Sequence, residues 1–177
     1  NLAPIVSPVM ALARVLRKMH GNTVKLIFIG PCVAKKDESD EVDATITFRE
    51  FQEMLEEENI TPDKVEGSEF DPPHSGRGAI FPISRGILQA INLQENLFKG
   101  NYGLINDHHL ELLCCEGCIM GPGMSVNGKR YENRAYITRY VRDKLEHLDV
   151  DAWEKDLEKY KDLDLTRSFT PDDRRVE

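Results

Sequence analysis

The sequence predicts an α/β fold with a mainly parallel sheet flanked by helices, and three features of the chain lead to that prediction. Residues 24–29 form a short apolar run bounded by Gly30 and Pro31, which is typical of a buried parallel strand. Apolar residues at helical spacing occur before this run and again after it. Strands that alternate with helices favour a parallel sheet, because each helix returns the chain to the end of the sheet where the preceding strand began.

The first two helices have clear start signals. Ser7 followed by Pro8 is typical of an N-cap with proline at the first helical position, and Gly21 marks the end of that helix. Its predicted apolar face consists of Val9, Leu12, Leu16 and Met19. Thr47 and Glu50 form a capping box for a second helix that extends to about residue 58. Its apolar face consists of Phe51, Met54 and Leu55.

The rest of the chain continues the alternation. Residues 67–78 carry many Gly, Pro, Ser and Asp residues and are predicted to form a long loop. A brief strand is expected at 78–83, then a helix that Ser84 caps, and further strands at 102–105 and 110–113. Two helices are predicted at 131–148 and 151–160, the first with an apolar stripe of Tyr136, Ile137, Tyr140, Val141 and Leu145. We expect Trp153 to be a packing residue as well.

Composition narrows the class of protein. The chain has 177 residues, of which 40% are hydrophobic and 31% charged, with a net charge of −8. These values predict a cytoplasmic globular protein without a membrane span or a secretion signal. The negative charge argues against nucleic acid as a partner, because phosphate binding needs clustered Lys and Arg. We expect one domain at 1–165, excised from a longer chain, and a polar linker at 166–177.

The cysteines are the main candidates for a functional site. Cys32 follows the predicted strand 24–29, at the end where ligands of parallel sheets bind. The other three, Cys114, Cys115 and Cys118, lie in a glycine-rich turn whose backbone amides could approach an anion. Spacing alone leaves an iron–sulfur cluster, a zinc site, a redox pair or a structural role open. His108 and His109 are predicted to be ordinary polar residues, because neighbours on a strand point to opposite faces.

Two segments resemble cysteine motifs of the iron-only hydrogenases. Residues 29–38, with Pro31-Cys32 followed by Lys35 and an acid, are similar to the second motif of that family, and 115–123 is similar to the third. The segment 78–90 and the opening Ser7-Pro8 also resemble parts of the family, in the same order. Together these segments span most of residues 2–140.

The resemblance implies a 4Fe-4S cluster held by Cys32, Cys115 and Cys118. Cys118 would stand at the position that also bridges to a di-iron subcluster. Cys114 remains the alternative third ligand, because it keeps the three-residue gap of the catalytic members, whereas Cys115 matches a shorter form associated with sensor proteins. Lys35 would stand where catalytic members use a lysine to hydrogen-bond the di-iron ligands, and its ammonium would offset the charge of the cluster.

Several departures from the family pattern concern the di-iron pocket. The first cysteine motif, which supplies one cluster ligand, is missing from this chain. Gly30 stands in place of a methionine, Val9 in place of a glutamine, and Leu112 or Leu113 in place of another methionine. These departures indicate a remodelled pocket, so we expect the fragment to be inactive.

Three functions follow from these observations, in order of preference. The first is an iron–sulfur, hydrogenase-like domain of a redox-active or sensory protein, partnered with ferredoxin-like and signalling domains of the same longer chain. The second is a catalytic hydrogenase that uses ferredoxin, and the third is a zinc-binding or structural domain. A cysteine motif upstream of this segment would complete the ligands of a cluster, so its presence would count against the zinc-binding or structural domain.

Overall fold

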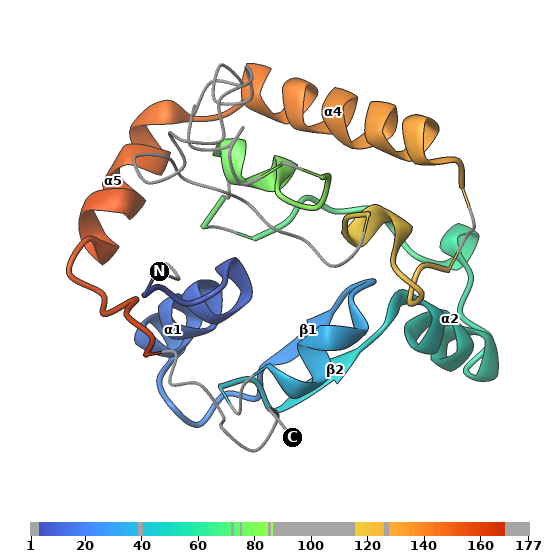
Figure 1. Cartoon of the computed structure of the whole chain (residues 1–177), viewed down its shortest axis with the longest axis horizontal. Helices are drawn as coiled ribbons and strands as arrows, with labels where there is room; N and C mark the ends of the chain where they lie inside the picture. Colours follow the sequence, from blue (N-terminus) through green and yellow to red (C-terminus); the bar gives the residue numbers. More distant parts are fainter. Residues whose placement is uncertain are drawn as a thin grey trace, which may run out of the picture.

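The computed structural model of the chain describes residues 4–38, 41–71, 73–74, 76–84, 86, 116–125 and 128–168, which combine helices with a small parallel sheet (Figure 1). Helix α1, Pro8–His20, begins where the sequence predicts: the Ser7 hydroxyl accepts a hydrogen bond from the Met10 amide, and Gly21 follows the last turn. Its buried residues are Met10 and Ala13, not the predicted face. Leu12 is 46% exposed, so the prediction of the buried face is wrong by part of a turn.

The sheet contains two parallel strands. Strand β1, Ile27–Ile29, pairs with β2, Ala44–Ile46, and Phe28 faces Thr45 in the register. The parallel pairing agrees with the predicted fold class, although the sequence did not indicate β2. The prediction that 24–29 is buried is wrong: Ile27 is 60% and Ile29 38% exposed, and Ile27 lines an open apolar groove.

Two short 3-10 helices and helix α2 follow β1 along the chain. Cys32 precedes the 3-10 helix η1, Val33–Asp37, and the predicted capping box starts α2, Phe48–Glu57. Thr47 and Glu50 exchange hydrogen bonds there as the sequence predicts: the Glu50 amide donates to the Thr47 hydroxyl at 3.1 Å, and the Thr47 amide donates to the Glu50 carboxylate at 2.7 Å. Another 3-10 turn, η2, follows at Pro62–Lys64.

The strand predicted at 78–83 is instead mostly the 3-10 helix η3, Gly76–Ile80. The Phe81 amide donates to the Gly78 carbonyl and the Ile83 amide to the Ile80 carbonyl, so successive tight turns replace an extended ladder. Only Ile83 forms a β-bridge within this segment, to Gly117. The segment 78–83 therefore forms turns and not the predicted strand.

The last two helices were predicted nearly at their observed positions. They are α4, Arg130–Glu146, and α5, Val150–Tyr160, which Asp149 caps. The predicted packing stripe of α4 is only partly correct, because Val141 is buried while Tyr136 and Tyr140 are 62% and 42% exposed. Trp153 on α5 does pack, with its indole nitrogen 3.1 Å from where a Cβ on Gly76 would lie.

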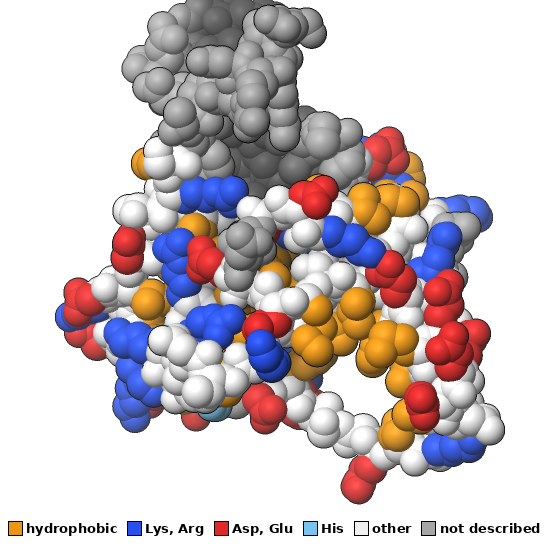
Figure 2. Space-filling model, turned by 90° about the horizontal axis from the view of Figure 1, so that it is seen from below, with side chains coloured by type: hydrophobic (Ala, Val, Ile, Leu, Met, Phe, Trp, Pro, Cys, Tyr) orange, Lys and Arg blue, Asp and Glu red, His pale blue; other side chains and the backbone are white. Residues whose placement is uncertain are grey.

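Figure 1 shows α1 and the sheet on one side, α4 and η3 on the other, and α5 along one edge. The buried hydrophobic side chains are few and belong to both sides: Val6, Met10, Ala13, Ile83, Ile119 and Val141. An apolar groove of about 770 Å³ lies between α1, β1, η3 and α5. Part of the predicted apolar face of α1, including Leu12 and Leu16, lines this groove. On the surface, hydrophobic side chains lie between groups of charged ones (Figure 2).

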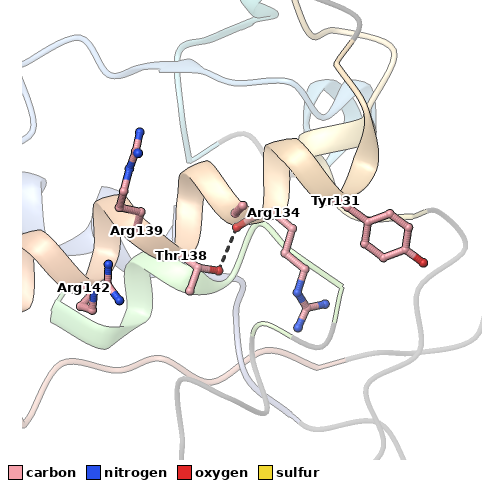
Figure 3. Close-up of a pocket in the computed structure, with 6 residues that line it drawn as sticks. Tyr131, Arg134, Thr138, Arg139 and Arg142 are labelled. Atoms are coloured by element: carbon pink, nitrogen blue, oxygen red, sulfur yellow. Dashed lines mark hydrogen bonds between the residues drawn. The ribbon is translucent and has the colours of Figure 1, made fainter.

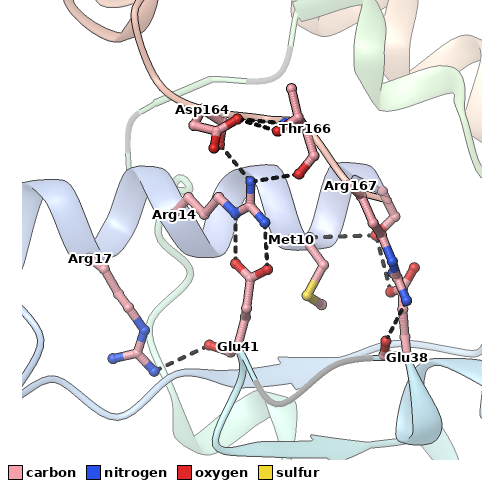
Figure 4. A network of polar contacts seen from close by, with 9 residues as sticks. Met10, Arg14, Arg17, Glu38, Glu41, Asp164, Thr166 and Arg167 are labelled. Atoms are coloured by element: carbon pink, nitrogen blue, oxygen red, sulfur yellow. Dashed lines mark hydrogen bonds and ion pairs between the residues drawn. The ribbon is translucent and has the colours of Figure 1, made fainter. Parts of the chain in front are cut away.

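A network of polar contacts, mostly hydrogen bonds to backbone carbonyls, joins the segment after α5 to the N-terminal half (Figure 4). Arg14 binds both carboxylate oxygens of Glu41 at 2.8 Å and donates to the Asp164 carbonyl at 2.6 Å. Thr166 forms an antiparallel bridge with Ile5. The Arg14 guanidinium lowers the pKa of the Glu41 carboxyl below its usual value, with further help from nearby arginines. Contacts distant in sequence thus fix both ends of the described chain to α1.

Several predicted elements lie outside the described residues. They are the helix after Ser84, the strands at 102–105 and 110–113, the histidines 108 and 109, and the cysteines 114 and 115. None of the described helices is long and apolar enough to cross a membrane.

Candidate functional site

Cys32 and Cys118 belong to two segments that lie against each other. After β1, the chain passes through Pro31 and Cys32 into η1, and the 3-10 helix η6, Cys118–Met120, lies in the glycine-rich turn. The Gly123 amide donates to the Pro31 carbonyl at 3.2 Å, so the residue before Cys32 is hydrogen-bonded to the segment that follows Cys118. Both cysteines are half-buried. The structure therefore brings together the two cysteine motifs that the sequence separates by more than eighty residues.

Two glycines make this close approach sterically possible. A Cβ on Gly121 would lie 2.6 Å from the Pro31 carbonyl oxygen and 3.1 Å from that of Cys118. A Cβ on Gly123 would lie 2.8 Å from the same Pro31 oxygen and 2.7 Å from Thr47 Cγ2. Real Cβ atoms do not approach backbone oxygens so closely, and these positions thus require glycine for space, not for an unusual φ.

The turn is also held from both sides by helices. The Arg49 amide in the first turn of α2 donates to the Gly123 carbonyl at 3.1 Å, which satisfies one of the free N–H groups at that helix start. From α4, the Asn133 side-chain amide donates to the Ile119 carbonyl at 3.0 Å. These contacts hold the backbone of the turn at Ile119 and at Gly123.

Lys35 is part of a half-buried cluster with Glu38 and Ser7. Its ammonium lies 2.8 Å from Glu38 Oε2, and the same oxygen accepts a hydrogen bond from the Ser7 hydroxyl at 3.0 Å. The side chains of Lys35 and Glu38 are 19% and 16% exposed. Sequence reasoning assigned Glu38 no role, although an acid three residues after a lysine on a helical turn was the signal for this ion pair.

The carboxylate of Glu50 links η1 to α2 beside the turn. Its pKa falls to about 2, first because Lys36 binds it, and then because the Thr47 amide and hydroxyl donate to it. Asp43, which directly precedes β2, also has a pKa of about 2, owing first to the Leu26 amide and then to Lys25. Both carboxylates are ionised across the neutral range and hold loops next to the sheet.

Gly30, at a position that departs from the family pattern, packs against an aromatic ring beside Cys32. It is buried, and a Cβ on it would lie 2.5 Å from Phe28 Cζ. The phenyl ring therefore occupies the space into which a larger side chain at position 30 would extend. Val9, at another position that departs from the family pattern, lines the apolar groove.

The donor set has the chemistry that an iron–sulfur cluster requires, as far as the described residues show it. Cys32 and Cys118 supply thiols from adjoining turns, and thiolates are the usual protein ligands of such clusters. Within the described part of the chain, no group of three or more Cys, His, Asp and Glu side chains is arranged around a common metal position. Cys114 and Cys115, one of which is predicted to be the third ligand, lie outside that part.

Comparison with known proteins identifies the family. The model of the iron-only hydrogenase large subunit, C-terminal domain, matches residues 1–110, which is more than half of the chain. The chain belongs to this family. The match includes the iron-only hydrogenase motif around Cys32 and Lys35 and ends before Cys118. The predicted resemblance to the family is thereby confirmed.

A curated relative matches a similar share of the chain. Iron hydrogenase 1 of Clostridium pasteurianum is 28% identical over an alignment 174 residues long, and the match covers 63% of this chain and 30% of that protein. The chain thus spans less than a third of the length of this hydrogenase. No solved structure matches the chain.

Proposed function

We propose that this chain is the iron–sulfur-binding part of a hydrogenase-like protein with a redox or sensory role. The observation that carries the proposal is the hydrogen bond between the Gly123 amide and the Pro31 carbonyl, which joins the two cysteine motifs. The family relationship supports it, because members of the iron-only hydrogenase family carry such clusters. A mainly parallel sheet flanked by helices is the fold we propose for the whole domain, 1–165.

Cys32 and Cys118 would hold a 4Fe-4S cluster together with Cys115, or with Cys114 in its place. When bound, such a cluster supplies one-electron redox chemistry. The backbone around the turn would fix the directions of the ligands, because Gly121 and Gly123 admit the close contact with Pro31. The cysteines would supply three of the ligands of such a cluster.

Lys35 would contribute an ammonium near the thiolates as one half of an ion pair. Its partner Glu38 also accepts a hydrogen bond from Ser7, so the pair is held in place from both sides. Charge near a cluster is one of the means by which a protein sets its reduction potential. This role suits a redox or sensory function, with ferredoxin-like and signalling domains of the same longer protein as partners in the cytoplasm.

A catalytic hydrogenase is the second candidate, and the name of the clostridial relative favours it. Against it stands the Phe28 ring, which fills the space beside Gly30 where catalytic members carry a methionine. A zinc-binding or structural domain is the third candidate.

The test is anaerobic reconstitution of the chain with iron and sulfide, followed by iron and sulfide analysis and electron paramagnetic resonance of the reduced sample. The chain has four cysteines, so each can be replaced by serine in turn. We expect Cys32→Ser and Cys118→Ser to abolish the cubane signal. Cys114→Ser and Cys115→Ser are controls for each other, because they make the same change at neighbouring positions. We expect only Cys115→Ser to lose the signal.

Two results would contradict the proposal. One is a cubane signal that survives in both Cys32→Ser and Cys118→Ser. The other is a chain that takes up one zinc ion per molecule in place of iron and sulfide, which would establish the third candidate.

A further inference from the structure

Helix α4 carries a row of exposed side chains that includes three arginines. Figure 3 shows these residues along the helix, and together they form what we call the α4 arginine stripe: Tyr131, Arg134, Ala135, Thr138, Arg139 and Arg142. Their spacing of three or four residues places them on one face, and all six are exposed. They line a shallow hollow of about 360 Å³, while the buried Val141 lies outside the stripe.

The three guanidinium groups lack acidic partners in the described part of the chain. Arg134, Arg139 and Arg142 form no ion pair there, and the Arg139 guanidinium lies 5.5 Å from the centroid of the Tyr136 ring. Other basic residues of the same helix behave differently. Arg130 pairs with Glu116 at 3.1 Å, and Lys144 pairs with Glu69.

Arg139 and Arg142 of the stripe lie three residues apart, which puts their like charges next to each other on the helix. Like charges three or four residues apart on a helix repel each other. The chain as a whole carries a net charge of −8 and has 31 acidic residues against 23 Lys and Arg, so acids to neutralise the stripe are plentiful in the sequence. Elsewhere in the fold, acidic side chains do pair with arginines, as Glu41 pairs with Arg14 through two hydrogen bonds.

We propose that the α4 arginine stripe docks an acidic surface of a protein partner. Arg134 and Arg142 lie two turns apart, about 12 Å along the axis, which matches carboxylates at every fourth position of an acidic helix. Guanidinium groups bind carboxylates through two parallel hydrogen bonds, and Arg and Tyr are enriched in protein interfaces. Tyr131 and Tyr136 are 81% and 62% exposed, so they provide aromatic surface beside the arginines.

The charge of the chain decides among classes of partner. A long polyanion or an extended anionic membrane would meet the acidic remainder of the surface, whereas a compact acidic patch would meet only the stripe. Because α4 also supports the turn of Cys118 through Asn133, the docked partner would lie one helix away from the cysteines. The stripe lies wholly on α4, so its docking does not depend on whether the cysteines bind a cluster.

The test uses the whole 177-residue chain and a fluorescein-labelled helical peptide of Ala and Glu with Glu at every fourth position. Binding is measured by fluorescence anisotropy, beside a control peptide that has Gln at the Glu positions. The variant Arg134→Gln/Arg139→Gln/Arg142→Gln keeps the helix propensity, since Arg and Gln are both good helix formers. The control Lys18→Gln/Lys155→Gln/Lys161→Gln makes the same change of charge elsewhere on the surface.

We expect the acidic peptide to bind the unaltered chain and the α4 variant to bind it about tenfold more weakly or worse, because several exposed pairs are lost at once. The lysine control should change the affinity less than about twofold, and added salt should weaken binding to the unaltered chain as screening increases. Circular dichroism of both variants checks that they remain folded.

Any of three results overturns the proposal. The first is no measurable binding of the acidic peptide. The second is an equal loss of affinity in the α4 variant and in the lysine control. The third is tighter binding by the stripe of a duplex DNA oligonucleotide or of phosphatidylserine vesicles than of the peptide, which would assign the stripe to another class of partner.

Discussion

Replacement of Gly123 by alanine should separate the two cysteine motifs without any change in their chemistry. The added Cβ would lie 2.7 Å from Thr47 Cγ2 and 2.8 Å from both Thr47 Cβ and the Pro31 carbonyl oxygen. Favourable contacts between such atoms lie near 3.5 Å or beyond, so each would be about 0.7 Å or more too close.

None of these neighbours can move easily. The Thr47 hydroxyl caps α2 through the Glu50 amide, which fixes its side-chain rotamer. The Pro31 carbonyl accepts the Gly123 amide itself. Overpacking of this kind costs roughly 1–3 kcal/mol, and we expect about 2 kcal/mol for Gly123→Ala, because strain falls on both a cap and a backbone hydrogen bond.

The assay is urea unfolding followed by circular dichroism, together with iron content after reconstitution. Gly67→Ala is the matched control, because a Cβ there meets nothing within 4 Å, so its stability should be unchanged or slightly higher. We expect Gly123→Ala to lower the free energy of unfolding and to bind less iron. Equal unfolding curves for the two variants would refute the argument from close approach.

Four further predictions follow from the described contacts. Thr47→Ala should lower the free energy of unfolding by about 1 kcal/mol, because α2 loses its N-cap. Urea unfolding measures this loss, and Thr47→Ser, which keeps a capping hydroxyl, should retain most of the stability of the unaltered chain. Lys35→Met should lower the free energy of unfolding by about 1–2 kcal/mol, because the half-buried Glu38 carboxylate loses its cation. Lys36→Met removes one partner of an exposed pair and should lower it by less than about 1 kcal/mol. Equal losses in the two variants would contradict this prediction. Glu50 and Asp43 have pKa values of about 2, below their ordinary values, so their contribution to stability is present above about pH 4.5 and is lost as the pH falls toward 2. The urea midpoint should therefore fall over that range, and Glu50→Gln/Asp43→Asn should show a shallower fall. The 177-residue chain should evolve no hydrogen from a reduced dye after anaerobic maturation; turnover at the rate of a standard hydrogenase would refute the sensory role.

Features that depend on neighbours a few residues apart could be predicted from the sequence. Ser7 and Thr47 were predicted as N-caps and are N-caps, because their hydroxyls accept hydrogen bonds from amides three residues later. The cysteine motif around Cys32 likewise pointed to the family, since it is a contiguous pattern that can be recognised without knowledge of its spatial neighbours.

Features that depend on what lies opposite in space required the tertiary structure. Helical periodicity gave α1 an apolar face, but the segments packed against it bury Met10 and Ala13 and leave Leu12 in an open groove. The pairing of Glu38 with Ser7 joins residues 31 apart, and the contact of Gly123 with Pro31 joins two motifs far apart in the chain. No local pattern encodes such contacts, because they depend on how whole elements pack and on whether the space at a glycine is filled by a neighbour.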